Sequence, residues 1–173
     1  MAESPESPYQ RNPFLYLRPP APTPAEEQCS CREPYPFKLM CALGSNPVYC
    51  MACNLEVPTE RYQPDGQLCY DLSHWVGLYN AMERLWLDSA DYERWAAEQF
   101  CDIHSRVNRL GLALPGRLNL LRRTYFWVWQ DQPTDDFEAI KACPLCGGLL
   151  QESPLGTYKQ VVCEKCLIVA AAD

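Results

Sequence analysis

The stretch that decides the fold is CPLCGG at residues 143–148, followed by CEKC at residues 163–166. Two cysteines separated by two residues can turn both sulfur atoms toward one point, and the glycines after the first pair permit the backbone of such a turn. Two facing pairs supply four thiolates in a tetrahedron, which is the arrangement around a structural zinc ion. Because protein atoms fill all four positions, no place is left for water or substrate. One structural zinc ion is therefore expected on Cys143, Cys146, Cys163 and Cys166.

The segments around these two pairs predict a small antiparallel sheet. Residues 149–151 and 158–162 can pair around the turn at residues 154–156, and residues 167–170 can add a third strand. So short a sheet buries too little surface to fold alone, and a structural zinc ion supplies the missing free energy, about 10 kcal/mol or more. Residues 132–173 are therefore predicted to form a three-stranded zinc ribbon.

The N-terminal segment, residues 1–36, holds nine of the sixteen prolines of the chain. Proline cannot donate a backbone hydrogen bond and biases its neighbours toward extended conformations. This segment is therefore predicted to be an extended, disordered arm, and residues 37–131 are expected to form the core.

Two amphipathic helices are predicted in this core. Apolar residues recur at spacings of three and four over residues 72–86, with Asp71 or Ser73 as the cap. A second apolar stripe covers residues 92–110, and Gly111 is a natural helix terminator. The short link between the stripes implies an antiparallel pair of helices.

Short strands are expected on both sides of the helices. Residues 48–53 read as a strand that runs into a cysteine turn, Pro115-Gly116 as a turn, and residues 124–129 as an aromatic strand. The predicted fold class is α+β: an antiparallel two-helix core with short strands, joined to the C-terminal zinc ribbon.

A third C-x-x-C pair, Cys50 and Cys53, has the same spacing but no matching pair beside it. Cys101 and His104 lie three residues apart on the predicted second helix and would share one of its faces, so a mixed site of these four residues is chemically sound. Both Cys50 and Cys53 are candidate metal ligands. The residues that could complete their site are Cys29, Cys31, Cys41, Cys69, His74, Cys101 and His104.

Composition narrows the class of protein. The chain has 173 residues, eleven cysteines and a formal net charge of −7. An odd number of cysteines with C-x-x-C spacing favours metal binding in a reducing compartment over a disulfide framework. The N-terminus lacks the features of a secretory signal, and no apolar run approaches the roughly 18 residues of a membrane span. These features predict a cytoplasmic protein without a membrane segment.

Five arginines occur between residues 103 and 130, where the chain has no acidic residue. Arginine beside exposed aromatic residues can hold single-stranded nucleic acid by phosphate pairing and base stacking. The favoured interpretation is internal: the arginines pair with the acidic residues of the preceding segment, residues 88–102, and the aromatic residues are core. The candidate nucleic-acid-binding residues are Arg106, Arg109, Arg117, Arg122 and Arg123.

Thr124-Tyr125-Phe126, the CPLCGG motif and the final CEKCLIVA together resemble the C-terminus of a family of uncharacterised bacterial zinc-ribbon-containing proteins, for which nucleic-acid binding has been suggested. That family similarly has a C-x-x-C near a Val-Pro, as in residues 50–58, and a helical stretch like residues 85–93. The resemblance covers residues 48–173. It implies zinc on the four C-terminal cysteines, Cys143, Cys146, Cys163 and Cys166, and a metal role for Cys50 and Cys53.

These observations favour a non-enzymatic zinc protein that binds another macromolecule. One hypothesis is a protein–protein module, such as an adaptor, an inhibitor or a bacterial immunity-type protein, because an acidic surface speeds encounter with a basic partner. The alternative is a nucleic-acid-binding protein that uses the arginines and the aromatic strand. No serine nucleophile elbow, phosphate loop or pair of catalytic carboxylates is evident, so no catalytic residue is assigned.

Overall fold

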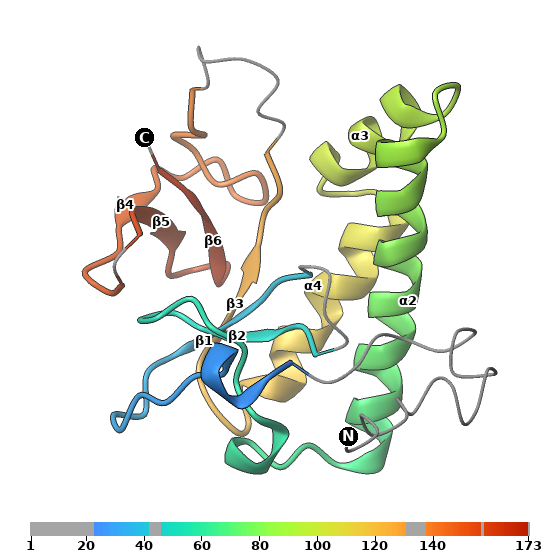
Figure 1. The fold of residues 1–173 in the computed structure, drawn as a ribbon. Coiled ribbons are helices and arrows are strands. Elements are labelled where there is room, and N and C mark those ends of the chain that lie inside the picture. Colours follow the sequence, from blue (N-terminus) through green and yellow to red (C-terminus); the bar gives the residue numbers. More distant parts are fainter. Residues whose placement is uncertain (1–22, 42–45, 131–137, 157, 173) are drawn as a thin grey trace, which may run out of the picture.

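The computed structural model describes residues 23–41, 46–130, 138–156 and 158–172, which form a mixed α/β fold (Figure 1). The helices are α2 (Gly66–Asp88), α3 (Glu93–Cys101) and α4 (Arg106–Leu118), and two 3-10 turns are η2 (Ala25–Glu27) and η3 (Thr59–Arg61). The strands are β1 (Phe37–Leu39), β2 (Val48–Cys50), β3 (Thr124–Trp127), β4 (Gln151–Glu152), β5 (Gln160–Cys163) and β6 (Ile168–Ala171).

All six strands belong to one sheet, in the order β2-β1-β3-β6-β5-β4. The outer pairs β2–β1 and β6–β5–β4 are antiparallel, whereas β3 pairs in parallel with both β1 and β6. The three C-terminal strands thus pair antiparallel, as their sequence predicts. They are not separate from the core, however, because the pairing of Phe126 with Ile168 makes them continuous with it.

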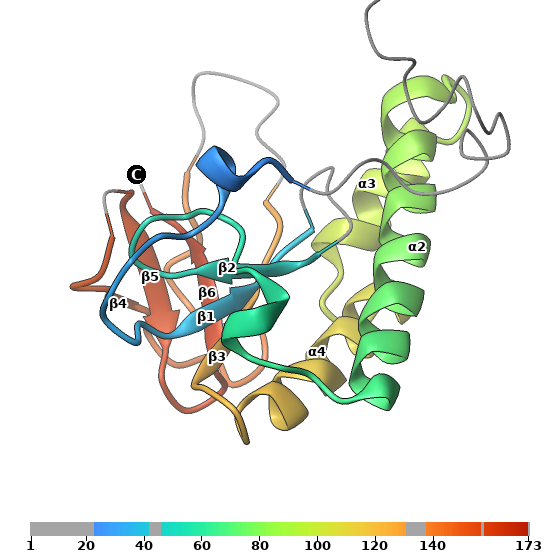
Figure 2. The same cartoon turned by 60° about the horizontal axis from the view of Figure 1, so that its bottom comes forward.

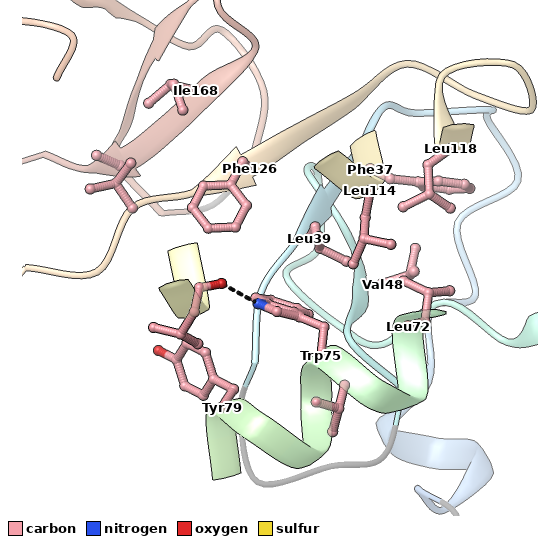
Figure 3. Packing of buried hydrophobic residues seen from close by; sticks show 14 of the residues in the cluster. Phe37, Leu39, Val48, Leu72, Trp75, Tyr79, Leu114, Leu118, Phe126 and Ile168 are labelled. Atoms are coloured by element: carbon pink, nitrogen blue, oxygen red, sulfur yellow. Dashed lines mark hydrogen bonds between the residues drawn. The ribbon is translucent and has the colours of Figure 1, made fainter. Parts of the chain in front are cut away.

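The three helices cover one face of the sheet, with α4 packed against both α2 and β3 (Figures 1 and 2). The main core lies in this layer, where Trp75 and Tyr79 of α2 meet Phe126 of β3 and Ile168 of β6 (Figure 3). The opposite face carries a smaller cluster of buried residues: Met51, Tyr125, Val162 and Val169.

The first helix begins earlier than its apolar pattern indicates. It starts at Gly66, and the carboxylate of Asp65 accepts a hydrogen bond of 2.7 Å from the backbone N–H of Leu68. An aspartate N-cap satisfies a donor that the first turn leaves unpaired. The prediction of a cap at Asp71 or Ser73 was therefore wrong.

The predicted second helix is two helices. The chain leaves α3 at Asp102 and restarts at Ser105, whose hydroxyl caps α4 by accepting from the N–H of Asn108 at 3.3 Å. The buried side-chain amide of Asn108 donates to the carbonyls of Phe100 and Asp102, each at 2.8 Å, and so holds the break in place.

Two residues expected to end or turn the chain lie within α4. Gly111 is there for close packing, because a Cβ on it would overlap the Phe126 ring and lie 2.8 Å from Trp75. Pro115-Gly116 falls in the last turns of the helix rather than in a separate turn. The helix tolerates Pro115 and Gly116 near its C-terminal end and continues to Leu118.

The described part of the segment predicted as a disordered arm, residues 23–36, is anchored to the body at Gln28 and Cys29. The backbone N–H of Cys29 donates to the carbonyl of Glu56 at 2.7 Å, and Gln28 forms a parallel bridge with Glu56. Cys29 is buried, and η2 forms just before it. Residues 1–22 of the predicted arm lie outside the described part of the chain.

Candidate metal centres

The four C-terminal cysteines converge as their spacing predicts. The sulfur atoms of Cys143, Cys146, Cys163 and Cys166 all lie within 4.8 Å of one another. Cys163 ends β5, and Cys166 precedes β6, so that a single hairpin positions both. We call this group the C-terminal cluster.

The first half of the C-terminal cluster is a turn closed by backbone hydrogen bonds. The N–H of Gly147 donates to the carbonyl of Cys143, and the N–H of Cys143 donates to the carbonyl of Gly148, each at 2.8 Å. Gly147 has a φ of 69°, a conformation that glycine adopts without steric cost. The backbone N–H of Gly148, followed by the neighbouring Cys166 thiol, lowers the pKa of the exposed Cys146 thiol to about 7. Since the thiolate is the form that binds metal, the turn favours ligation.

A second cluster lies at the other end of the sheet. The sulfur atoms of Cys29, Cys31, Cys50 and Cys53 also lie within 4.8 Å of one another. The pair Cys50 and Cys53 follows β2, and the hydrogen bond from Cys29 to Glu56 brings the N-terminal segment alongside it. We call these four residues the N-terminal cluster.

The N-terminal cluster resolves the choice that the sequence left open. Cys29 and Cys31 complete the Cys50–Cys53 pair, so the mixed site with Cys101 and His104 was wrong. Both of those residues lie around the break between α3 and α4. The signal for the true partners is the C-x-C spacing at residues 29–31, but only the tertiary pairing of that segment with Glu56 places it beside β2.

Both clusters fit a divalent metal ion such as zinc. Tetrahedral zinc with Zn–S bonds of about 2.3 Å requires sulfur atoms roughly 3.8 Å apart, and the sulfurs of Cys146 and Cys163 are 3.7 Å apart. A disulfide would require about 2.05 Å. Among the residues that the structure describes, these are the two groups of three or more potential ligands that converge on one point.

Arg61 lies directly against the N-terminal cluster. Its Nη1 donates to the carbonyl of Cys29 at 2.8 Å and approaches the Cys29 sulfur at 3.3 Å, while its Nη2 donates to the carbonyl of Cys31. One guanidinium thus holds the C-x-C segment in place. A cavity of about 170 Å³ beside it is also lined by Arg32 and Arg122.

A buried lysine lies on the sheet between the two clusters. Lys38 of β1 is 1% exposed, its Nζ donates to the Oε1 of Gln160 at 3.0 Å, and it lies 4.7 Å from the centre of the Trp127 ring. Burial lowers the pKa of Lys38 to about 8, and the thiols of Cys50 and Cys53 act in the opposite direction. Sequence reasoning missed both Lys38 and Arg61, since neither belongs to a motif.

The candidate nucleic-acid-binding arginines do not act as one group. Arg117 pairs with Asp65 at 3.1 Å and with Asp71, and Arg123 pairs with Glu164. The expected pairing of these arginines with the acidic residues of segment 88–102 was wrong: within the described chain, the one ion pair made by that segment is internal, between Arg94 and Glu98.

The remaining arginines differ in their surroundings. Arg122 lies over the Phe37 ring at 5.5 Å. Arg106 and Arg109 are exposed on α4, and neither forms an ion pair with another described residue. In the aromatic strand Tyr125 and Phe126 are buried and Trp127 and Trp129 are half-buried, so that little aromatic surface is open for base stacking.

Each of α2, α3 and α4 is too short or too polar to cross a membrane, and the rest of the described chain forms no such helix. Comparison of the chain with protein-family models, with curated proteins and with solved structures finds no match in any of the three. The functional interpretation therefore depends on the two cysteine clusters and their surroundings.

Proposed function

We propose that this protein binds two structural zinc ions and serves as a non-enzymatic module for binding another protein. The observation that carries the proposal is the convergence of two complete sets of four cysteine sulfurs at opposite ends of one sheet. In each cluster the protein supplies all four ligands, which is typical of structural rather than catalytic zinc. When bound, zinc would supply the cross-link that short strands lack.

The surroundings of the clusters support a structural role. A cavity of about 460 Å³ near β4 and β5 is lined by residues such as Leu149, Lys159 and Val161, with neither a cysteine nor a histidine. The metal ligands therefore do not line that cavity. Cys29 and Cys50 do line the smaller cavity of about 170 Å³, but their cluster already brings four sulfurs together. A catalytic zinc site would instead combine three protein ligands with an open position that faces a cleft.

The surface at the turn between α2 and α3 supports a protein partner. Leu87, Tyr92 and Trp95 are 53%, 58% and 47% exposed. Aromatic side chains of this kind are enriched at protein interfaces. This surface, which we call the helical tip, is bordered by the acidic residues Asp88, Asp91, Glu93 and Glu98. Its negative charge suits a basic protein partner. Such a partner fits the role of an adaptor, an inhibitor or an immunity-type protein.

Nucleic-acid binding is the second candidate, and the exposed Arg106 and Arg109 together with Arg122 favour it. The net charge of −7 opposes it at long range. The burial of Tyr125 and Phe126 leaves only the half-buried Trp127 and Trp129 of the aromatic strand for base stacking. We expect binding of short single-stranded DNA or RNA to be weak, with a Kd of roughly 10⁻⁴ M at physiological salt. Submicromolar binding in fluorescence anisotropy that is lost in Arg106→Glu/Arg109→Glu would instead favour this function.

Metal analysis tests the zinc proposal directly. Protein purified without chelator should contain two zinc ions per chain by elemental analysis. Cys29→Ser and Cys146→Ser should each lose one, because a site of three sulfurs binds zinc more weakly. Cys69→Ser is the matched control, since Cys69 is exposed on α2 outside both clusters, and it should retain both ions. Iron, or a metal-free native protein, would contradict the proposal.

A protein partner can be sought by testing whether its capture depends on the helical tip. Affinity purification from the native host, followed by mass spectrometry, should identify a basic protein. Tyr92→Ala/Trp95→Ala should abolish its capture while leaving the zinc content at two. Tyr70→Ala, on an exposed part of α2 away from the tip, should capture it normally. Equal capture by both variants would exclude the tip as the interface.

A further inference from the structure

We infer that Lys38 and Arg61 balance the charge of a metal-loaded N-terminal cluster, and that the buried charge of Lys38 makes metal at this cluster a condition for stable packing of the sheet. The inference rests on the proposed binding of a divalent ion by Cys29, Cys31, Cys50 and Cys53. It assigns positioning roles to two residues outside the ligand set.

Lys38 has the burial of a core residue and the charge of a surface residue. Its side chain is 1% exposed, yet none of the ion pairs among the described residues includes it. Its polar partner is the neutral amide of Gln160, and its other close neighbour is the Trp127 ring. A buried charge without an opposite charge is costly to the folded state. Another source of negative charge is therefore required nearby.

The N-terminal cluster is that source. Four thiolates with one divalent ion carry a net charge of −2. Lys38 and Arg61 oppose this charge, and Arg32 and Arg122, which line the neighbouring cavity, add to them. Arg61 contacts the Cys29 sulfur at 3.3 Å from the solvent side. Lys38 acts from within the sheet, where the pairing of β1 with β2 sets it opposite Tyr49, the residue before Cys50. Thiolates at Cys50 and Cys53 favour its protonated form.

Hydrogen bonds connect Lys38 to both ends of the sheet. Lys38 donates to the side chain of Gln160 on β5, and the Nε2 of Gln160 approaches the carbonyl of Met51 at 3.4 Å. Met51 lies between Cys50 and Cys53, and Gln160 lies three residues before Cys163. Without thiolates in the N-terminal cluster, an unbalanced ammonium would remain inside this small network. Loss of the metal should therefore loosen the contact between the two ends of the sheet.

Lys38→Met separates a charge role from a packing role, because methionine keeps the apolar stem and removes the charge. We expect the variant to bind zinc at the N-terminal cluster about 10- to 100-fold more weakly, the effect of one unit charge roughly 6 to 12 Å away at an effective dielectric constant near 20. The metal-free variant should unfold at a higher urea concentration than the metal-free wild type. A packing role alone would lower the stability of both forms and leave the affinity unchanged.

The experiment uses the full chain, with zinc release to a chelating dye as one readout and urea unfolding in excess chelator as the other. Cys29→Ser and Cys146→Ser assign the two release steps to the two clusters. Lys165→Met is the matched control, because Lys165 lies between two ligands of the C-terminal cluster but is exposed. This variant should change the rate of neither zinc-release step by more than about twofold, since water screens exposed charges.

Arg61 provides a second, exposed variant that does not disturb the core. Arg61→Gln should speed release from the N-terminal cluster alone by about tenfold, the effect of one charge-assisted hydrogen bond. Arg94→Gln, which removes an exposed arginine paired with Glu98, should not. Unchanged affinity in both Lys38→Met and Arg61→Gln would overturn the inference. A wild-type protein with no metal at this cluster would instead overturn the proposed function.

Discussion

The indole Nε1 of Trp75 donates a hydrogen bond of 2.9 Å to the carbonyl oxygen of Val107, and this bond fixes α2 to the first turn of α4. The same indole lies over the Cα of Gly111, one turn further along α4, where a Cβ would approach it to 2.8 Å. Phe126 of β3 closes the contact at a ring distance of 6.1 Å. Trp75 of α2 is thus in close contact with both α4 and β3 (Figure 3).

Trp75→Phe should destabilise the protein by about 2 to 3 kcal/mol. The change removes the indole hydrogen bond to the carbonyl of Val107 and opens space beside Phe126. Urea unfolding followed by far-UV circular dichroism would measure it. Trp95→Phe, at a side chain that is 47% exposed, should change stability by less than about 0.5 kcal/mol. Equal effects of the two substitutions would contradict this account of the core.

Two glycines of α4 should respond in opposite directions to alanine. Gly111→Ala should cost about 1 to 3 kcal/mol, because the added methyl group overlaps the Phe126 ring. Gly116→Ala should stabilise by about 0.5 to 1 kcal/mol, since nothing lies within 4 Å of its Cβ and alanine lowers the entropy of the unfolded chain. Thermal unfolding of both variants provides the comparison, and a stabilised Gly111→Ala would disprove the close approach.

A second pair of glycines tests the contact between the two ends of the sheet. Gly156 has a φ of 97°, and a Cβ there would lie 2.7 Å from the carbonyl oxygen of Met51. Gly147 has a φ of 69° but nothing within 4 Å of its Cβ. Alanine at Gly147 should cost only the roughly 1 to 2 kcal/mol of a left-handed backbone, and alanine at Gly156 should cost more.

Hydrogen exchange would locate the damage in these two variants. Gly156→Ala should raise exchange in the segment 50–53 as well as in β5, whereas Gly147→Ala should affect only the turn around Cys143. If the two exchange patterns coincide, the loop at residues 153–156 does not support the N-terminal cluster.

Removal of one C-terminal ligand should unfold part of the molecule. Cys146→Ser should abolish exchange protection in β4 and β5 and weaken it in β6, because β4 has only two residues, whereas β6 also pairs with β3. The amide of Phe126, which donates to the carbonyl of Leu167 at 2.7 Å, should also lose protection. The α2–α4 contact should lose the least protection, since α2 and α4 pack directly on each other and α4 packs on β3. Retained protection in β5 would show that the cluster is dispensable.

The parts of the fold that depend on local chemistry could be predicted from the sequence. The spacing of Cys143, Cys146, Cys163 and Cys166 places their sulfurs together through two tight turns, and the structure brings them together. The apolar period of residues 72–86 gives α2 its buried face, with Leu72, Trp75, Val76, Tyr79 and Met82 in the core. In both cases the residues that determine the structure lie close together in the sequence.

The parts that depend on tertiary contacts could not be predicted. The break before Ser105 relies on the amide of Asn108 reaching back to carbonyls of the preceding helix, and no periodicity signals it. β1 is only three residues long, and its central residue is a buried lysine, which argues against a strand on sequence grounds. The choice of Cys29 and Cys31 as partners likewise depends on their pairing with a remote segment.

The order of segments along the chain has a consequence for how the protein is made. All four N-terminal ligands lie within residues 29–53, whereas β1 pairs with β3, which begins only at Thr124. During translation the N-terminal cluster is complete as soon as Cys53 has left the ribosome, but one edge of β1 then has no partner until the helices have been synthesised. A chain that folds as it emerges would therefore have a hairpin, cross-linked by the proposed metal ion, with an open edge. Arrival of Thr124–Trp127 would close that edge and join the two ends of the sheet.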